Sequence, residues 1–265
     1  MAVARGPPAP RGRLRIDLPE TERIAVVAAC GGDGTVSEVA QALSGTGVAL
    51  AVVPAGTANV WAREALVPRA PERALALLAE GRRARVDLGE VDARIGGGVA
   101  RLFLLMCSAG VDAGVVERIE RHAALKRRLG RVAYAALAEL PAVPASVTVD
   151  GDSRRAALWM AIVGNTRLYG GIVRLTARAL ANDGMLDLAI FEHARPGARL
   201  RHLRSSSQAL AALRGRLDAG RPRGFGSARG RTARCSAAEP LRLAVRPRAL
   251  EVVIGAAPNP LLGEA

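Results

Sequence analysis

The chain has 265 residues, half of them hydrophobic and only 3% aromatic, which predicts a packed globule with one large or two modest cores. Its formal net charge of +14 attracts nucleotides, anionic lipid headgroups and nucleic acid, but so few aromatic side chains for base stacking argue against specific nucleic-acid binding. The three cysteines lack a CxxC spacing and no apolar run approaches about 18 residues, so no zinc site, disulfide framework or transmembrane segment is indicated.

The first 84 residues change from a polar start to a regular α/β pattern. Residues 1–22 are rich in Pro and Arg and predict a disordered start without a hydrophobic signal core, as in a cytoplasmic protein. Residues 23–84 alternate short apolar runs with helical periodicity. The expected strands and helices, in chain order, are 24–30, 36–43, 48–54, 58–66 and 71–81. Such strand–loop–helix units are typical of a doubly wound parallel sheet, so we predict an α/β fold class with a parallel-sheet lobe here.

From residue 85 to residue 256 the pattern is different. Short strand-like segments separated by turn residues predict a mainly antiparallel β-rich lobe, with inserted helices at 113–140 and 197–217. Residues 195–234 carry eleven arginines and one acidic residue. Residues 257–265 are expected to be a tail. A cleft between the two lobes is the expected place for a ligand.

Two glycine-rich loops carry the strongest chemical signal. GGDGT, residues 31–35, lies where an expected strand ends and a helix begins, and PAGTAN, residues 54–59, repeats this arrangement one unit later. Glycine lets the backbone approach a phosphate closely, and a helix N-terminus offers unpaired N–H groups and a favourable dipole. Asp33 is placed to bind Mg²⁺ or to orient an acceptor hydroxyl. One such loop is equally well explained as a tight turn, but the pair predicts two phosphate-facing loops side by side.

These loops and several later segments carry a family resemblance. GGDGTVSEVAQAL followed by VPAGTANVWAREA resembles the catalytic domain of diacylglycerol kinases and of the bacterial lipid kinases related to them and to sphingosine kinases. The resemblance continues through SAGVDAGVVERI and VGNTRLYGGIVRLTARALANDGMLDLAIFE and returns in VRPRALEVVI. It implies an N-terminal lobe like that of phosphofructokinases and NAD kinases, and a C-terminal antiparallel β-sandwich lobe. It also implies an ATP-dependent lipid kinase of phospholipid biosynthesis, with diacylglycerol as the default substrate.

The resemblance further implies roles for particular residues. Asp33 would be catalytic, and the phosphates of ATP would be contacted by Gly31, Gly32, Gly34, Thr35, Gly56, Thr57 and Asn59. The segment 180–185 is similar to the family's structural Mg²⁺ loop, in which the Asp183 carboxylate and the carbonyls of Leu180 and Met185 would be ligands. Apart from the resemblance, the charge of the basic run at 126–128 is explained equally well by a solvated helix face and by a patch that holds the protein peripherally at an anionic membrane. A homodimer is left open.

The chain departs from the family pattern in two places. No Asn-Pro-x-x-Gly loop precedes GGDGT, as in a chain truncated at its N-terminus or read from a misassigned start. Near the C-terminus the corresponding segment reads Ser236-Ala237-Ala238-Glu239-Pro240, in which Glu239 matches the glutamate of the family's Asp-Gly-Glu turn but Ala237 stands at the position of its aspartate. The main alternative is therefore a catalytically impaired relative that binds nucleotide or anionic membrane without turnover. NAD kinases also share GGDGT, but PAGTANVWARE favours a lipid kinase.

Overall fold

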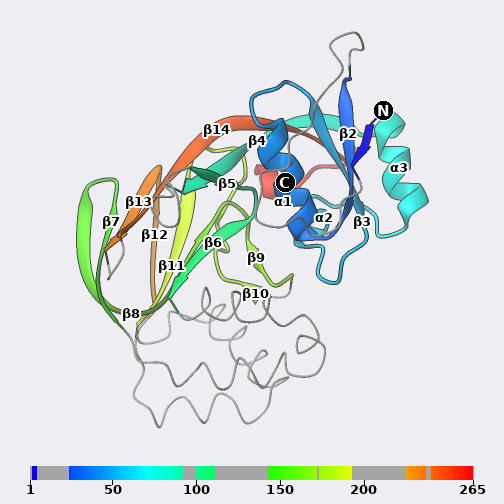
Figure 1. The fold of residues 1–265 in the computed structure, drawn as a ribbon. Coiled ribbons are helices and arrows are strands. Elements are labelled where there is room, and N and C mark those ends of the chain that lie inside the picture. Colours follow the sequence, from blue (N-terminus) through cyan, green and yellow to red (C-terminus); the bar gives the residue numbers. More distant parts are fainter. Residues whose placement is uncertain are drawn as a thin grey trace, which may run out of the picture.

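The computed structural model of the chain describes residues 2–4, 24–91, 100–110, 143–171, 173–192, 225–236 and 240–264. Twelve strands form one continuous, strongly curved sheet, and a two-stranded ribbon lies beside it (Figure 1). One end of this sheet is parallel and covered by helices, whereas the other end is antiparallel. The predicted change from an α/β half to a β-rich half is thus present within a single sheet.

The parallel end consists of strands β1 (Ala2–Ala4), β2 (Val26–Gly31), β3 (Ala49–Pro54) and the C-terminal part of β14 (Pro240–Ile254). β2 and β3 pair in register from Val26 with Ala49 to Gly31 with Pro54. Both strands therefore end at the same edge of the sheet, and the two glycine-rich loops leave from that edge together.

Three helices cover the two faces of the parallel end. They are α1 (Asp33–Leu43), α2 (Val60–Glu64) and α3 (Pro71–Glu80). α1 and α2 pack on one face, where they share the main core with alternate residues of β2 and β3. α3 packs through Leu77 and Leu78 against the small side chains of the opposite face. The apolar face of α1 is formed, at helical spacing, by Val36, Val39, Ala40 and Leu43.

The antiparallel end holds the remaining strands. They are β4 (Arg82–Val91), β5 (Arg101–Phe103), β6 (Met106–Gly110), β7 (Val143–Val149), β8 (Asp152–Gly164), β11 (Leu186–Glu192), β12 (Phe225–Gly230) and β13 (Thr232–Ser236). β9 (Leu168–Tyr169) and β10 (Val173–Arg174) form the separate ribbon. These strands curl around a second core, to which β5, β7, β8, β11 and β14 contribute buried apolar side chains.

Strand β14 belongs to both ends of the sheet. Its C-terminal part pairs parallel to β3 through Val252 and Leu50, and its N-terminal part pairs antiparallel to β13. β4 runs antiparallel beside it through both regions, from Val91 to Arg82. The boundary predicted near residue 85 therefore falls inside a strand that crosses from one region to the other, and the α/β half takes its innermost strand from the end of the chain.

Both ends of the chain are more ordered than expected. Residues 2–4 form β1 on the free edge of β2, so the expectation of a disordered start is wrong for these three residues. Pairing satisfies backbone groups that an open edge would leave exposed. The expected tail is also wrong, because Leu261 and Leu262, in a 3₁₀ turn (Pro260–Leu262), pack into the main core at 1% and 9% exposure. Burying two leucines offsets the cost of ordering this segment.

Several sequence expectations concern residues outside the described ranges. These are the helices at 113–140 and 197–217, the basic run at 126–128, and Ala237 with Glu239. Within the part of the chain that the structure describes, no helix has both the length and the apolar character needed to cross a membrane.

Candidate nucleotide-binding site

The two glycine-rich loops touch through their backbones. A Cβ atom added to Gly56 would lie 2.4 Å from the Cα of Gly32, and one added to Gly32 would lie 3.2 Å from the Cα of Gly56. Only two glycines allow so close an approach, because any side chain would fill the space between the loops. The expectation that the loops lie side by side is confirmed.

The first loop presents the open end of α1. Gly31 is the last residue of β2, and Gly32, in an extended conformation, is the N-cap of the helix without a side-chain capping bond. The first backbone bond of the helix runs from the N–H of Val36 to the carbonyl of Gly32, at 3.0 Å. The N–H groups of residues 33–35 therefore have no acceptor within the helix, which is the arrangement that favours an anion. Gly31 is required because a Cβ there would lie 2.6 Å from Thr35 Oγ1.

The second loop is closed by the Asn59 side chain. Its Oδ1 accepts a bond from the Gly56 N–H at 2.9 Å, and its Nδ2 donates to the Gly56 carbonyl at 2.7 Å. Asn59 is buried and adopts a left-handed conformation with φ of 47°, which asparagine tolerates well. Its amide is therefore engaged in shaping the loop, whereas Thr57 is exposed at the loop surface.

Asp33 connects the first loop to the helix that follows the second. Its Oδ1 accepts a hydrogen bond from the N–H of Trp61, in the first turn of α2, at 3.1 Å. Its Oδ2 has no partner among the described residues, and the side chain is only half-buried. Asp33 thus has one oxygen that fixes its orientation and one that is available to a metal ion or a hydroxyl. Trp61 itself is buried in the core.

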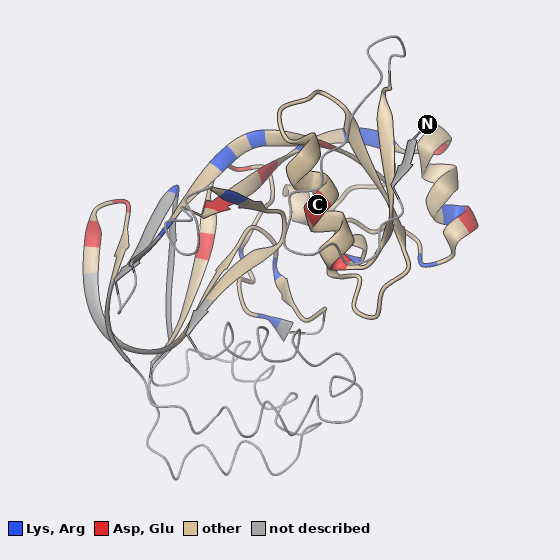
Figure 2. Cartoon of the chain, in the orientation of Figure 1, with Lys and Arg blue, Asp and Glu red and all other residues tan. Residues whose placement is uncertain are grey.

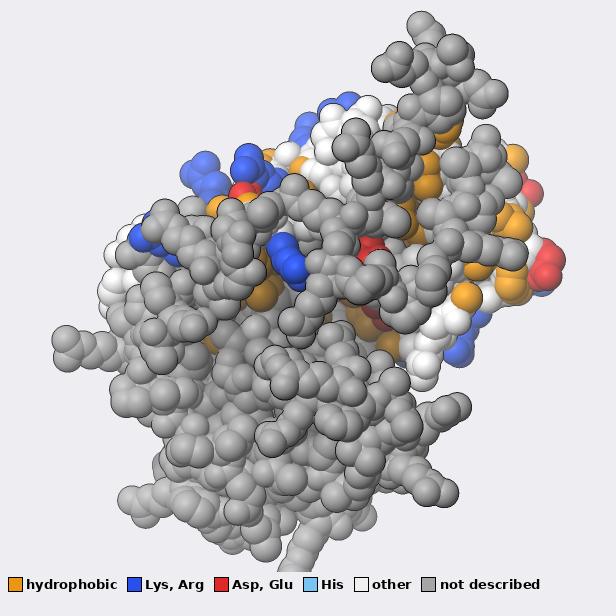
Figure 3. Space-filling model, in the orientation of Figure 1, with side chains coloured by type: hydrophobic (Ala, Val, Ile, Leu, Met, Phe, Trp, Pro, Cys, Tyr) orange, Lys and Arg blue, Asp and Glu red, His pale blue; other side chains and the backbone are white. Residues whose placement is uncertain are grey.

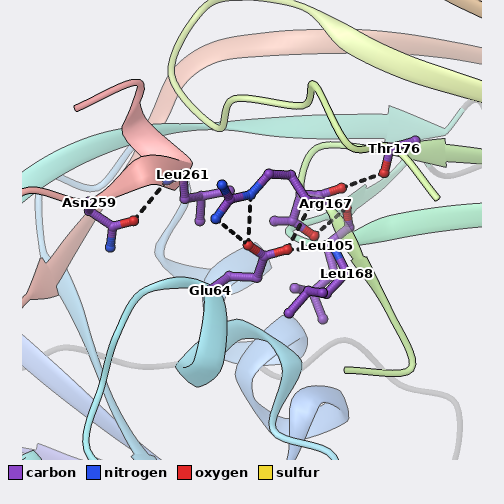
Figure 4. A network of polar contacts seen from close by, with 8 residues as sticks. Glu64, Leu105, Arg167, Leu168, Thr176, Asn259 and Leu261 are labelled. Carbon is purple, nitrogen blue, oxygen red and sulfur yellow. Dashed lines mark hydrogen bonds and ion pairs between the residues drawn. The ribbon is translucent and has the colours of Figure 1, made fainter. Parts of the chain in front are cut away.

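The other end of α2 is bonded to the β-rich half. The Glu64 carboxylate accepts hydrogen bonds from the main-chain N–H groups of Arg167 and Leu168 and from two guanidinium nitrogens of Arg167 (Figure 4). Neighbouring Arg63 donates from Nη1 to the Gly171 carbonyl at 2.8 Å. Sequence reasoning missed the Glu64–Arg167 pair, because its members are 103 positions apart and neither forms a local motif.

The turn that resembles a magnesium loop is held on β4 and the C-terminal segment. The N–H of Asp87 donates to the Ala181 carbonyl, and the N–H of Ala181 donates to the Leu261 carbonyl. Asp183 is exposed, and its Oδ1 accepts a bond from the N–H of Met185 at 3.0 Å. No group of three or more potential His, Cys, Asp or Glu ligands occurs within the described ranges. A carboxylate and main-chain carbonyls at Leu180 and Met185 are nevertheless an oxygen-only donor set, which fits Mg²⁺ with water completing its shell.

Asp87 is a second buried carboxylate that the sequence analysis did not single out. Its Oδ2 accepts a bond from the N–H of Gly184 at 2.6 Å, and its Oδ1 accepts one from the N–H of Arg248 at 2.7 Å. Burial raises the pKa of Asp87, while the two backbone hydrogen bonds act in the opposite direction. The available signal was an acidic residue between two apolar residues, Val86 and Leu88, of β4.

Comparison with known proteins gives consistent relatives for both halves. Residues 16–91 match the diacylglycerol kinase catalytic domain, and residues 106–211 match the YegS C-terminal NAD kinase beta sandwich-like domain. A protein named "Diacylglycerol kinase" from Mycobacterium tuberculosis is 34% identical over 167 residues, which are 60% of this chain and 52% of that protein. One named "Probable lipid kinase YegS-like" from Pseudomonas syringae pv. tomato is 39% identical over 171 residues, or 62% and 53% of the two chains. The chain therefore spans about half the length of these relatives.

Solved structures agree with the fold. A crystal structure of a diacylglycerol kinase from Bacillus anthracis str. Sterne covers 88% of this chain and 78% of that chain, with a TM-score of 0.64 and 18% sequence identity. The predicted parallel α/β lobe followed by an antiparallel β-sandwich lobe is thereby confirmed. Because the two matching domains together cover more than half of the sequence, in agreement with the relatives named above, the chain belongs to the diacylglycerol kinase catalytic-domain family.

Proposed function

We propose that this chain is an ATP- and Mg²⁺-dependent lipid kinase that transfers the γ-phosphate of ATP to a lipid hydroxyl, with diacylglycerol as the most favoured acceptor. The observation that carries the proposal is the backbone contact between Gly32 and Gly56. It brings two glycine-rich loops to one sheet edge, beside a helix N-terminus whose N–H groups are unbonded within the helix. Membership of a family of kinases supports the reaction type.

The residues of the two loops would act by binding and orientation. The N–H groups of residues 33–35 and the loop at 56–59 would hold the phosphates, and the free Oδ2 of Asp33 would hold Mg²⁺ or receive the hydroxyl proton of the lipid. In the reaction a bond forms between the lipid oxygen and the γ-phosphorus, and the bond from that phosphorus to the bridging oxygen of ADP breaks. Phosphoryl transfer depends mainly on positioning and charge neutralisation, which these groups supply.

The Mg²⁺ ion carried by ATP would supply charge neutralisation, and the turn at 180–185 would hold a second, structural ion. Its ligands would be the Asp183 carboxylate and the carbonyls of Leu180 and Met185. The buried Asp87 carboxylate supports this turn, because it accepts the Gly184 N–H and so fixes the backbone between these ligands. A rigid turn lowers the entropic cost of gathering several oxygen ligands around one cation.

Peripheral attachment to an anionic membrane is supported by the distribution of charge. Basic residues recur along β14 and are visible as blue bands in Figure 2. Arg242, Arg246 and Arg248 are exposed, although Arg246 pairs with Glu90. A positive surface of this kind attracts anionic headgroups, and each basic residue contributes about 1 kcal/mol near the bilayer. The proposed lipid substrate resides at such a surface.

Transfer of labelled γ-phosphate from ATP to lipids in mixed micelles tests the proposal. The acceptors are diacylglycerol, monoacylglycerol and sphingosine, with NAD⁺ as a soluble comparison. We expect label in one lipid and a loss of at least about 100-fold in kcat/KM for Asp33→Asn. Asp152→Asn, which changes an exposed carboxylate at the start of β8, is the matched control and should retain wild-type transfer.

Other outcomes of this assay favour other functions. Binding of ATP by a folded protein that labels no acceptor would support the impaired relative. Label in NAD⁺ alone would overturn the lipid-kinase assignment. Equal lipid transfer by wild type and Asp33→Asn would remove Asp33 from the catalytic role while leaving the reaction type intact.

A further inference from the structure

Helix α2 cannot define its own position. It has only five residues, and a helix of that length is unstable in isolation. It begins immediately after Asn59, the residue that closes the second glycine-rich loop, so its placement determines how that loop ends. Its first turn bonds to Asp33 and its last residue, Glu64, bonds to the β8–β9 turn. α2 is therefore fixed by tertiary contacts at both ends.

The contact made by the Glu64 carboxylate is strong and excluded from solvent. The carboxylate side chain is 1% exposed, and its two oxygens together accept four hydrogen bonds from Arg167 and Leu168 (Figure 4). The bonds from Arg167 Nε and Nη2 to Oε2 measure 3.1 and 2.9 Å. A buried carboxylate is stable only if it is paired and hydrogen-bonded, and both conditions are met here. Loss of any of these four donors would leave the buried carboxylate with fewer hydrogen bonds than it needs to offset its lost hydration.

The turn that supplies these donors is itself rigid. Asn165, which is completely buried, donates from Nδ2 to the carbonyls of Asp87 and Leu104, at 2.8 and 3.0 Å. The Thr166 carbonyl, also buried, accepts a bond from Thr176 Oγ1 at 2.6 Å. Arg167 therefore extends from a fixed part of the β-rich half. The hydrogen bonds form a continuous path from this turn, through Glu64 and α2, to the Asp33 carboxylate.

We infer that Glu64 and Arg167 are positioning residues, through which the β-rich half sets the orientation of Asp33. The inference rests on the proposed function, because the role of Asp33 belongs to it. The path is specific: Arg167 fixes Glu64, Glu64 fixes α2, and α2 presents the Trp61 N–H that holds Asp33 Oδ1. The second loop closes on itself through Asn59 and Gly56, so nucleotide binding depends less on this path than transfer does.

Glu64→Gln tests the path most directly. The glutamine amide would direct N–H groups at the donors of Arg167 and Leu168 and leave the guanidinium without its counter-charge. We expect kcat per nucleotide-binding site to fall about 10-fold while KM for ATP and lipid changes less than about threefold. Titration calorimetry with ATP counts the competent sites, so a loss caused by partial unfolding would appear as lower stoichiometry. Arg167→Lys, which keeps the charge and the main-chain donors but loses the guanidinium fork, should give a smaller loss in the same direction.

Glu251→Gln is the matched control. It removes a glutamate paired with Arg83 at 3.0 Å, in an ion pair where the arginine is half exposed, far along the sequence from both loops. An exposed pair contributes little, so this variant should keep wild-type kcat within about twofold. If Glu64→Gln and Arg167→Lys also keep wild-type kcat, or lose turnover only in proportion to stoichiometry, the inference is overturned.

A second readout does not depend on lipid phosphorylation. Hydrogen exchange of the Trp61 amide reports whether its bond to Asp33 persists, and we expect this exchange to become at least about 10-fold faster in Glu64→Gln but not in Glu251→Gln. If the wild type labels no lipid, the proposed function fails while faster Trp61 exchange in Glu64→Gln still supports the link. Unchanged Trp61 exchange in a folded Glu64→Gln protein contradicts the link whatever the activity of the wild type.

Discussion

The two turns at which the sequence predicted bound ions are built in opposite ways. At the paired glycine-rich loops, backbone packs on backbone and the N–H groups at the start of α1 remain unbonded within the helix. At the turn of residues 180–185, the Gly184 N–H is taken up by the buried Asp87 carboxylate, and Asp183 accepts the Met185 N–H. A turn with free donors favours an anion, whereas a turn whose donors are satisfied internally presents oxygens and favours a cation.

The largest expected effect comes from separating the two glycine-rich loops. In Gly56→Ala the new methyl group would lie 2.4 Å from Gly32 Cα and 2.8 Å from Asn59 Oδ1, so one loop must move. We expect the free energy of unfolding to fall by about 1–3 kcal/mol and ATP affinity to fall at least about 10-fold. Urea unfolding and calorimetry measure the two quantities. Gly255→Ala, where an added Cβ meets nothing within 4 Å, is the control, and equal behaviour of the two variants would contradict the importance of the contact.

A smaller effect is expected where a carboxylate supports the second turn. Asp87→Asn replaces an acceptor of two backbone N–H groups by an amide, one side of which can only donate. We expect a loss of about 1–3 kcal/mol in the free energy of unfolding, measured in EDTA so that no divalent ion contributes. Asp183→Asn changes the exposed carboxylate of the same turn and should cost less than about 0.5 kcal/mol under these conditions. If Asp183→Asn lost more unfolding free energy than Asp87→Asn, then Asp183 would support the turn and Asp87 would be the candidate ligand.

The smallest effect concerns the core beneath the β-rich half. Cys107 packs against this second core, and burial raises the pKa of its thiol to about 11. In the unfolded chain the Cys107 thiol would ionise first, with a pKa near its ordinary value of 9.0. The stability that the folded protein gains from keeping this thiol neutral is therefore present below pH 9 and is lost as pH rises toward 11. We expect alkylation of Cys107 in the native protein to remain slow at pH 8, as followed by mass spectrometry. Alkylation of Cys107 in the native protein as fast as in the urea-unfolded chain would show that solvent reaches the second core, contrary to this expectation.

The sequence predicted best those features whose signals lie within a few residues. Pro71 at a helix start and Gly81 after its end predict α3, which the structure places at Pro71–Glu80 with Gly81 as C-cap. α2 was expected at 58–66 but is limited to Val60–Glu64. Asn59 before it and Leu66 after it adopt positive φ values of 47° and 56°, which no local pattern of an Asn or a Leu reveals.

The contacts that organise the candidate site were beyond sequence reasoning for a different reason. Glu64 meets Arg167 only after the two halves have packed together, and Asp87 meets Gly184, 97 positions later, only after the β-rich half has folded. Each partner taken alone looks like an ordinary charged or turn residue, so the pairing appears only in three dimensions.

The exposure of hydrophobic side chains also depends on the folded structure. Leu66 and Leu75 are exposed hydrophobic side chains, and Figure 3 shows apolar side chains at the surface around α3.

The route of β14 has a consequence for how the protein is made. The innermost strand of the α/β half is translated after every other strand that the structure describes, and it then pairs with β3 through Val252 and Leu50. Until that strand leaves the ribosome, β3 keeps an open edge that can pair with other chains, and its closure requires a contact of high sequence separation. The sheet that carries the glycine-rich loops, although these loops are encoded early, is therefore complete only after the last strand has been made, and the edge of β3 stays exposed until then.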